Sequence, residues 1–336
     1  MMTGTHKKNP GLLEWIPNIS TGDEVMVREL GSIFRSIPDV FLLHIDRGPD
    51  VNRTVFTLAG TMSGLRTALL EMMEWSTQKL DMGIHQGSHP RLGALDVCPY
   101  VLLQEGDVQE VLLWIRGLAR EVSEKFHLPI YLYEKSATHP HRVNLAEIRR
   151  GEYEGLQEKL LEPRWKPDFG QQFNSRLGAT VMGLRDFLIA YNVNLGSKEM
   201  GFAKTMASKI REKGPTGRPH SLPGVKALGW YLEKPGFCQV STNITRTHET
   251  TLLDVYDHCI TLGNELGVKI TGSELIGLIP WHNVQSMLSR SFTSHTLAEY
   301  LGLGYCDISD LKTRVIEYKV YLASGKTIFK EIFETR

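Results

Sequence analysis

The order in which strand-like and helix-like patterns follow one another is the feature that most restricts the fold of this chain. The first half reads strand, helix, strand, strand, helix, strand, helix, strand. A doubly wound parallel sheet requires strict alternation of strands with helices, so this order argues against that architecture. The sequence instead predicts an α+β fold in which one sheet is covered on one side by helices.

The elements expected in the first half are bounded by capping and turn residues. We expect strands and helices at 12–19, 23–36, 40–46, 52–58, 61–78, 94–103, 107–126 and 128–132. Ser20 or Thr21 is the expected cap of the first helix and Asp107 of the third, because their side-chain oxygens can accept hydrogen bonds from the first helical N–H groups. The segment 47–50 predicts a hairpin turn. Two short helices broken at Gly151 follow, and we interpret their charges as a solvated face.

The second half repeats a similar order. Expected elements are strand 188–195, helix 202–211, strands 225–232 and 237–244, helix 249–265 and strand 268–271. This is a βαββαβ order, and the Lys-Pro-Gly sequence at 234–236 is a hairpin signal. The Gly- and Pro-rich segment 214–224 predicts a loop. We therefore expect two subdomains, residues 1–180 and residues 181–336.

Composition argues against several classes of function. Lysine plus arginine equals aspartate plus glutamate, 38 of each, so net charge gives no reason to expect nucleic acid or a membrane surface as a partner. The four cysteines are far apart, follow no metal-ligand spacing and fit a reducing compartment. The first residues lack the apolar core of a signal peptide, and no run reaches membrane-spanning length. We expect a soluble, cytoplasmic protein.

The stretch 80–100 concentrates the chemically active side chains. It contains two histidines, an arginine, two aspartates and a cysteine around Gly87 and Pro90. Glycine tolerates positive φ, and proline fixes φ while removing a donor, so we expect irregular backbone over 83–93. Polar, titratable groups on a loop between apolar elements are typical of a site that a scaffold holds in place. His89 is its centre, because Pro90 restricts it to extended backbone.

Three kinds of site fit this stretch. His85 and His89 have the four-residue offset of zinc-binding helices, but the nearby glycine and proline disfavour a helix. The second kind of site is a nucleophilic Cys98 activated by a histidine. The alternating pattern around Cys98 is also typical of a buried strand in which a cysteine is a small core residue. The third is His89 as a general acid/base, with Arg91 holding an anionic substrate. We favour the third, and a histidine that is satisfied only structurally is its alternative.

A long motif runs through this stretch: Asp81-Met82, His85, Gly87 and His89-Pro90-Arg91-Leu92-Gly93-Ala94-Leu95-Asp96-Val97-Cys98-Pro99. It resembles the signature of the glutamate formimidoyltransferases, the formiminotransferase family. Further segments that are similar to family patterns lie at 46–57, 145–156, 187–195, 239–243 and 272–280. The resemblance covers about 12–320, and chance does not readily produce a motif this long and this mixed in residue type.

The resemblance implies a fold and a reaction. The family has two ferredoxin-like (βαββαβ-type) subdomains with a substrate groove between them, and a homodimer is its expected state. It moves the formimino group of N-formimino-L-glutamate to N5 of tetrahydrofolate in histidine breakdown, with tetrahydrofolate as co-substrate and without a metal. Its partners are these small molecules. Vertebrate members carry a fused cyclodeaminase domain, and we expect 336 residues to hold the formiminotransferase part alone.

The resemblance also implies roles for individual residues. His89 falls on the catalytic histidine, which acts in turn as the base for N5 and the acid for the leaving nitrogen, and Asp46 belongs to the active site near it. The expected substrate- and folate-binding residues are Arg91, Asn52, Arg53, His85, Asp168, Phe169, Gly170 and Gly178. The arginines can bind carboxylates of glutamate or of the folate tail. For Asp46 and Asn52, turn formation is the alternative role.

Three positions near the expected site depart from the family pattern. Thr21 replaces an acid, His44 stands where an aspartate is frequent, and Ser88 replaces glutamate or glutamine. These departures bear on the choice of one-carbon donor more than on folate binding. A folate-binding homologue with an altered donor, such as formyl transfer, or with no turnover is therefore the alternative function. A metal-dependent hydrolase that uses His85 and His89 is a second rival.

Overall fold

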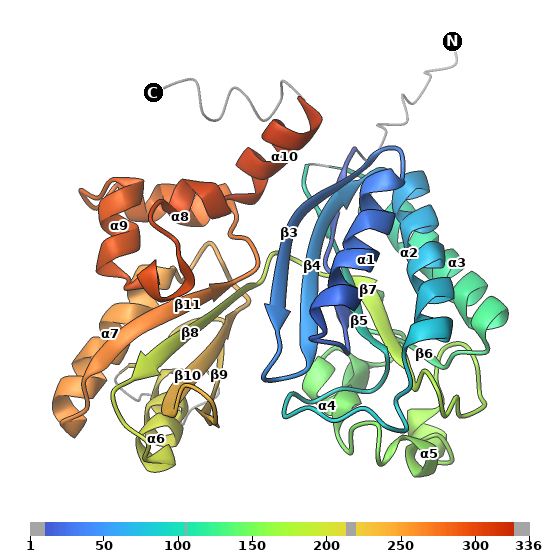
Figure 1. Ribbon diagram of the computed structural model, residues 1–336, viewed down its shortest axis with the longest axis horizontal. Helices are drawn as coiled ribbons and strands as arrows, with labels where there is room; N and C mark the ends of the chain where they lie inside the picture. Colours follow the sequence, from blue (N-terminus) through green and yellow to red (C-terminus); the bar gives the residue numbers. More distant parts are fainter. Residues whose placement is uncertain (1–10, 105, 213–219, 326–336) are drawn as a thin grey trace. The chain divides into compact units, whose positions relative to one another are not determined.

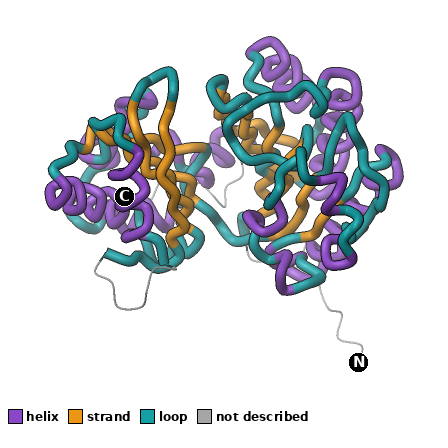
Figure 2. Tube along the Cα trace, turned by 90° about the horizontal axis from the view of Figure 1, so that it is seen from below, coloured by secondary structure: helices purple, strands orange, loops and turns teal. Residues whose placement is uncertain are grey.

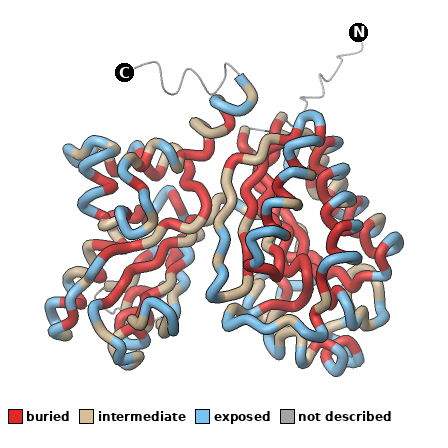
Figure 3. Tube along the Cα trace, in the orientation of Figure 1, coloured by how far each residue is buried: buried red, intermediate tan, exposed pale blue. Residues whose placement is uncertain are grey.

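The computed structural model of the protein (Figure 1) describes residues 11–104, 106–212 and 220–325. The chain divides into two compact units, Met1–Asp186 and Phe187–Arg336, and each is built around its own β-sheet. Both units combine helices with strands, so the expected α+β class is confirmed. Within each unit, burial is concentrated in the strands and on the sides of the helices that pack against them (Figure 3).

The first unit consists of β1 (Leu13–Trp15), β2 (Asn18–Ile19), α1 (Glu24–Ser36), β3 (Val40–Gly48), β4 (Arg53–Gly60), α2 (Met62–Lys79), β5 (Leu95–Leu102), α3 (Val108–Phe126), β6 (Ile130–Leu132), α4 (Leu145–Arg149), α5 (Leu156–Lys159) and β7 (Thr180–Leu184). Short 3₁₀ turns between β6 and β7 lie at Glu134–Ser136, Pro140–Arg142 and Pro163–Trp165. Among the described residues, the strands are ordered β1-β4-β2-β5-β7-β6, with β3 paired to β4. β5, β7 and β6 run parallel to one another, and the other pairs are antiparallel.

Most elements predicted for this half are confirmed, with two differences. The predicted strand 12–19 is split into β1 and β2 around Pro17, which has no N–H to offer a strand ladder. The cap of α1 is Asp23, whose carboxylate accepts a hydrogen bond from a main-chain N–H of the first turn, and the predicted hydroxyl caps are therefore wrong. Asp107 caps α3 as predicted.

Helices pack on both faces of the first sheet, whereas the sequence predicted coverage on one side. α1, α2 and α3 lie side by side on one face (Figure 1) and bury its apolar side chains. Successive strand residues point to opposite faces, so Cys98 belongs to this core and Val97 to a second one. The second core joins Val97 to Ile148 of α4 and Leu156 of α5. The one-sided prediction is wrong because the charged segment that forms these helices also carries apolar residues.

β7 determines where the first unit ends. It pairs with β5 from Val97↔Val181 to Tyr100↔Leu184, and with β6 on its other side. The first unit therefore includes all of β7 and extends through Asp186.

The second unit consists of β8 (Ile189–Leu195), α6 (Met200–Ile210), β9 (Val225–Leu232), β10 (Phe237–Ile244), α7 (Leu252–Leu266), β11 (Ile270–Ile276), α8 (Trp281–Leu288), α9 (Ser294–Tyr300) and α10 (Ile316–Ser324). Its described strands form an antiparallel sheet in the order β11-β8-β10-β9, drawn in orange in Figure 2. The β9–β10 hairpin is confirmed at its predicted bounds. Most of the predicted loop 214–224 lies outside the described residues. In the described part of the chain, no helix is both long enough and apolar enough to cross a membrane.

Gly178 packs its α-carbon against the backbone of residue 92. Its φ is 71°, and a Cβ built there would lie 2.2 Å from the carbonyl oxygen of Leu92. We expect Gly178→Ala to lower the free energy of unfolding by more than about 1 kcal/mol, because left-handed backbone and a backbone clash both disfavour a side chain. Urea unfolding followed by circular dichroism measures the loss.

Gly117→Ala is the matched control. Gly117 lies in α3, and a Cβ there meets nothing within 4 Å. Stability should rise by about 0.5–1 kcal/mol, because glycine weakens a helix interior relative to alanine. Equal effects of the two substitutions would contradict the close contact at Gly178.

Candidate active site

The signature loop, residues 83–93, joins α2 to β5 without forming a helix or strand, as predicted. Asn52, in the turn between β3 and β4, holds the loop. Its Oδ1 accepts from the N–H of Gly22 at 2.8 Å, and its Nδ2 donates to the carbonyl oxygen of Gln86 at 2.8 Å. Its φ of 49° lies in the left-handed region, which asparagine tolerates better than most residues. Asn52 thus ties the hairpin to the loop. This is similar to turn formation, the alternative role considered for it.

His85 is held in one tautomer. Its Nε2 donates to the carbonyl oxygen of Asn52 at 3.1 Å, and its Nδ1 accepts from Nε of Arg91 at 3.3 Å. A carbonyl can only accept and a guanidinium can only donate, so the ring proton lies on Nε2. Burial lowers the pKa of His85 below its ordinary value. With both nitrogens engaged in a non-helical loop, the ring offers no lone pair to a metal ion, and these bonds disfavour His85 as a zinc ligand.

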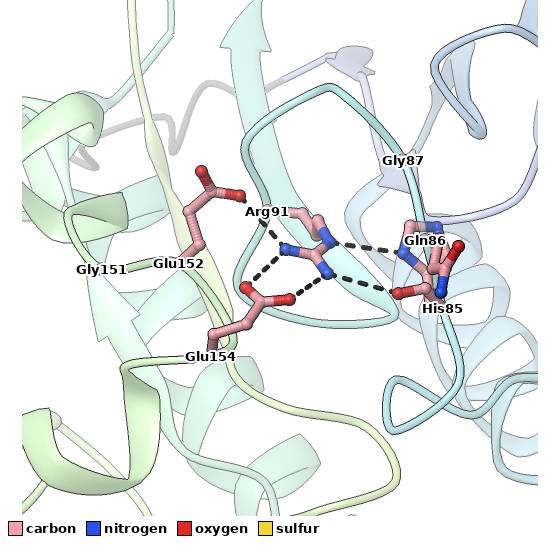
Figure 4. Close-up of a pocket in the computed structure, with 7 residues that line it drawn as sticks. All are labelled: His85, Gln86, Gly87, Arg91, Gly151, Glu152 and Glu154. Carbon is pink, nitrogen blue, oxygen red and sulfur yellow. Dashed lines mark hydrogen bonds and ion pairs between the residues drawn. The ribbon is translucent and has the colours of Figure 1, made fainter.

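Arg91 is held by two acidic residues from the segment between α4 and α5 (Figure 4). It donates to Glu154 through Nη1 at 2.7 Å and through Nη2 at 2.6 Å, and to Glu152 through Nη1 at 3.1 Å. A pocket of about 460 Å³ here is lined by His85, Gln86, Gly87, Arg91, Gly151, Glu152 and Glu154. The Arg91 side chain is only 7% exposed. A substrate carboxylate can therefore bind it only by displacing Glu154.

A buried carboxylate, Asp96, connects the loop to two arginines. It accepts hydrogen bonds from Nη1 of Arg53 on β4, and from Nε and Nη2 of Arg149 on α4. The N–H of Leu92 donates to the same carboxylate at 2.9 Å. Asp96 is 0% exposed, so these donors replace the water that an ionised carboxylate would otherwise need. We call Arg53, Asp96 and Arg149 the Asp96 cluster.

A β-bulge accounts for a charged residue in this central strand. The register between β2 and β5 skips Asp96, and a bulge bends its strand and re-aims a side chain. Here the carboxylate meets α4, through Arg149. Asn18 of β2 fixes the other arginine, because its Oδ1 accepts from Nε and Nη2 of Arg53 at 3.2 and 2.8 Å. Arg53, a predicted carboxylate binder, thus uses its donors inside the protein.

Burial and charge shift the pKa values of these groups. Burial alone would raise the pKa of Asp96, but the charges of Arg149 and Arg53 lower it to about 2. Burial lowers the pKa of Arg53 to about 10. Burial, and then the charges of Arg53 and Arg149, lower the pKa of His89 to about 3. Burial keeps His89 neutral at physiological pH, together with the one net positive charge that one carboxylate between two guanidiniums leaves.

His89 is half-buried, and one hydrogen bond fixes its tautomer. Its Nδ1 lies 2.8 Å from the carbonyl oxygen of Pro90, which can only accept, so Nδ1 donates. The neutral ring therefore has its proton on Nδ1 and its lone pair on Nε2. A general base needs such a lone pair.

Asp46 lies on β3 and hydrogen-bonds to His44. The distance between Nε2 of His44 and Oδ2 of Asp46 is 3.1 Å, and both side chains are largely buried. The charges that act most strongly on His89 are those of the Asp96 cluster. The structure therefore brings His89 together with Asp96, and it places Asp46 with His44, one of the three departures from the family pattern.

Cys98 is part of the core of the first unit. Its Sγ accepts a hydrogen bond from Nε1 of Trp15 at 2.9 Å, and the residue is 0% exposed. Burial raises the pKa of the thiol to about 12. Because the thiolate is the reactive form, this environment disfavours Cys98 as a nucleophile.

Asp168 is a structural tie near β6. Its Oδ2 accepts from the N–H of Leu132 at 2.8 Å and from Nη1 of Arg142 at 3.0 Å, and its Oδ1 accepts from the hydroxyl of Thr138. The side chain is 5% exposed. Its acceptors are thus directed to the protein rather than to a ligand.

The other residues expected to bind folate are held by close packing. The N–H and carbonyl of Phe169 both bond to Ile130, and the guanidinium of Arg120 lies 5.6 Å from its ring centre. Gly170 has φ 69°, and a Cβ there would lie 2.6 Å from the carbonyl oxygen of Leu128. Gly178 contacts the end of the signature loop, as described above. Gly178 is next to the loop that carries His89, whereas Asp168, Phe169 and Gly170 contact the region of β6.

Four residues of this arrangement were not predicted from the sequence as site residues: Asp96, Arg149, Glu152 and Glu154. The last three belong to the charged segment that was interpreted as a solvated face, yet the Arg149 side chain is only 14% exposed. A signal for Asp96 was present. An aspartate inside an otherwise apolar strand needs a buried partner of opposite charge.

Comparison with known proteins shows the family of the chain. The family models described as "Formiminotransferase domain, N-terminal subdomain" and "Formiminotransferase domain" match residues 12–185 and 190–321. The glutamate formimidoyltransferase of Streptococcus pyogenes serotype M1 is 36% identical over 271 residues, which cover 80% of this chain and 89% of that protein. The corresponding protein of Thermoplasma acidophilum is 36% identical over 80% of this chain and 88% of its own length.

Longer relatives match as well. The formimidoyltransferase-cyclodeaminase of Dictyostelium discoideum is 36% identical over 92% of this chain and 60% of its own length. This chain thus spans about 60% of the length of such relatives. The chain belongs to the formiminotransferase family.

We predict that Asp96→Asn destabilises the protein strongly. Removal of the carboxylate leaves two guanidiniums facing each other without compensation, and loss of one partner of a buried ion pair costs about 3–5 kcal/mol. Urea unfolding at neutral pH measures the change. Asp186→Asn is the control, because Asp186 pairs with Lys135 at the surface, where about 1 kcal/mol or less is expected. A loss at Asp96 no larger than this control would contradict a buried ion-pair cluster.

The depressed pKa of His89 gives a second prediction. Proton NMR of the free protein should show the His89 ring titrating near pH 3, far below the ordinary value of 6.5. Arg149→Gln should raise this pKa, because the charge of Arg149 lowers it.

Between pH 3 and 6.5 the unfolded chain binds more protons at this position than the folded one. The contribution of His89 to the free energy of unfolding is therefore fully present above pH 6.5 and is lost as the pH falls toward 3. An ordinary midpoint would refute the assigned environment.

Proposed function

We propose that the protein transfers the formimino group of N-formimino-L-glutamate to N5 of tetrahydrofolate, with His89 as general base and acid. Relatives named glutamate formimidoyltransferase support this, since the chain covers 89% of one and 88% of another. The observation that carries the proposal is the neutral imidazole of His89, whose Nε2 is an acceptor beside a cluster of net positive charge.

In the proposed reaction, N5 attacks the carbon of the protonated amidine. A new C–N bond forms, and the C=N electron pair becomes the lone pair of an amine. Nε2 of His89 takes the proton that N5 loses. The amine lone pair then re-forms the C=N bond while the bond from this carbon to the glutamate nitrogen breaks. His89 gives its proton to that nitrogen, which leaves as the amine of glutamate. General acid–base help of this kind contributes about 10²–10⁴-fold.

Arg149 is the arginine best suited to anchor a substrate carboxylate. Arg91 is committed to Glu154, and Arg53 to Asn18 and Asp96. Among the residues that the structure describes, Nη1 of Arg149 donates no hydrogen bond, while its Nε and Nη2 point to Asp96. An arginine that is oriented by a buried carboxylate and keeps one donor is a preorganised site for a second carboxylate.

The remaining predicted residues have supporting parts in this proposal. Asp46 is proposed to balance the charge of His89 while the ring is protonated, with His44 fixing its carboxylate. His85 and Asn52 hold the loop, and Gly178 supports it. The segment Asp168-Phe169-Gly170 is proposed to shape the folate site through its backbone rather than through side-chain bonds.

We further propose that both units are ferredoxin-like and that the substrates bind in a groove between them. The strand order β11-β8-β10-β9 with two helices supports a βαββαβ unit. In the first unit the order β3-β4-β1/β2-β5 supports the same pattern, extended by β7 and β6. A subdomain boundary near 180, a cytoplasmic location, a homodimer, and the absence of metal, nucleic acid and membrane from the reaction remain predictions. Light scattering tests the dimer.

A transfer with a different donor is the alternative function. The observation in its favour is His44, which hydrogen-bonds to Asp46 at a position where the family frequently has an aspartate. A formyl donor, such as N-formyl-L-glutamate, would be tested in the same assay as the formimino donor.

The first test is the transfer reaction itself. Purified protein should convert tetrahydrofolate and N-formimino-L-glutamate to 5-formimino-tetrahydrofolate, which acid turns into the absorbing methenyl form. His89→Ala should lower kcat by about 10²–10⁴-fold, because the proton carrier is lost. No turnover by the wild type with either donor would contradict the proposal.

Arg149→Lys tests the carboxylate anchor. The ammonium keeps the charge but loses the planar fork, so the KM for N-formimino-L-glutamate should rise about tenfold or more. The KM for tetrahydrofolate should change less. Arg150→Lys is the control, because the neighbouring Arg150 is exposed and pairs with Glu147. Equal effects on the two KM values, or equal effects of the two variants, would rule out a specific anchor at Arg149.

A further inference from the structure

One face of the second sheet carries a connected set of polar side chains. Val193 and Val240 point to the other face, where α6 and α7 pack over an apolar core. Their neighbours along the strands alternate to this face. The polar set consists of Asn192 and Asn194 on β8, Trp230 on β9, Gln239 on β10 and Glu274 on β11.

The register of the sheet aligns these side chains. Gln239 lies opposite Trp230 on one side and opposite Asn194 on the other. Glu274 lies opposite Asn192. Gln239, Asn194 and Asn192 are 0%, 1% and 6% exposed. Burying an amide without hydrogen-bond partners costs folding free energy, so the hydrogen bonds of these side chains should explain their arrangement.

Trp230 sets the orientation of the whole network. Its indole Nε1 can only donate, and it donates to Oε1 of Gln239 at 2.8 Å. The Nε2 group of Gln239 therefore faces the other way, where it donates to Oδ1 of Asn194 at 2.8 Å and to Oε2 of Glu274 at 3.2 Å. Nδ2 of Asn192 donates to the same oxygen at 3.2 Å. Two amides thus fix one carboxylate oxygen of Glu274.

The network leaves two acceptors unused. In the described part of the chain, Oε1 of Glu274 accepts no hydrogen bond, Oδ1 of Asn192 accepts none, and Glu274 forms no ion pair. Glu274 is partly exposed, so solvent or a ligand can reach its carboxylate. The carboxylate is held by one oxygen, and its second oxygen and the amide oxygen of Asn192, its cross-strand neighbour, remain to accept hydrogen bonds.

We propose that Glu274 and Asn192 form a subsite for an amidine-type N–C–N unit that carries two N–H donors. The two unused oxygens come from cross-strand neighbours, whose side chains lie close enough to meet adjacent N–H groups of one planar ligand. The negative charge of Glu274 strengthens such bonds, most of all to a cationic amidine. Gln239 and Trp230 are positioning residues, because they act through the carboxylate.

Two molecules of the proposed reaction carry this unit, and the inference rests on that proposal. One is the formimino group of N-formimino-L-glutamate. The other is the 2-amino-4-oxo ring of tetrahydrofolate, with its N3–H and 2-amino group. The chemistry recognised is the same, and binding measurements with each compound alone distinguish the two sources.

The test is Glu274→Gln in the full chain, with Glu299→Gln as control. Glu299 is exposed on α9 and outside the network. Isothermal titration calorimetry gives the Kd of N-formimino-L-glutamate and of tetrahydrofolate for each protein. We expect the Kd of one compound to rise at least tenfold in Glu274→Gln and neither to change in the control. The compound whose Kd rises is the one whose N–C–N group binds the subsite. If it is the formimino donor, the wild type should also prefer this donor to N-formyl-L-glutamate, and the variant should lose the preference.

Trp230→Phe provides a second, milder variant. It removes the N–H that orients Gln239 and keeps an aromatic ring, so the same compound should bind severalfold less tightly. Unchanged Kd values for both compounds in both variants would overturn the subsite. If the wild type shows no turnover but Glu274→Gln still weakens the binding of one compound, the result contradicts the proposed reaction and supports the subsite. A wild type that binds neither compound would overturn both.

Discussion

The ion pairing of Asp96 with Arg53 and Arg149 is the interaction on which the candidate active site depends. The three side chains come from β5, β4 and α4, and the carboxylate also receives the N–H of Leu92. A carboxylate and two guanidiniums are stable in a buried position only together. The cluster therefore fixes the end of the signature loop against the sheet, and its position is determined by electrostatic necessity as well as by packing.

A second set of bonds fixes the other side of the same loop. Arg91 joins His85 to Glu154, and Asn52 joins the β3–β4 turn to Gln86. Irregular backbone has no ladder of its own hydrogen bonds, so a loop of this kind keeps one conformation only when side chains supply them. Arg91 and the arginines of the Asp96 cluster thus have opposite surroundings. Arg91 is neutralised by glutamates, whereas the Asp96 cluster keeps a positive charge next to His89.

The sequence predicts the elements well where periodicity and caps agree, as in α3 with its Asp107 cap and in the β9–β10 hairpin. It places the irregular loop correctly, because Gly87 and Pro90 exclude regular structure there. It fails for the bulge at Asp96 and for the burial of Arg149, since both depend on which strands and helices meet. Periodicity reports one element at a time. It cannot tell that a charged turn of helix packs an arginine onto a bulged strand.

The charge of the Asp96 cluster links substrate binding to the strength of the base in the proposed reaction. A histidine whose pKa is about 3 is a weak base at neutral pH. Burial is the largest cause of this low pKa, and the charges of Arg53 and Arg149 come next. A substrate carboxylate that binds Arg149 cancels the net positive charge of the cluster, so the pKa of His89 rises from its value in the free protein. The free protein then holds the ring neutral and correctly protonated on Nδ1. The donor that brings the carboxylate also makes Nε2 a better base, so chemistry is favoured when the donor is in place.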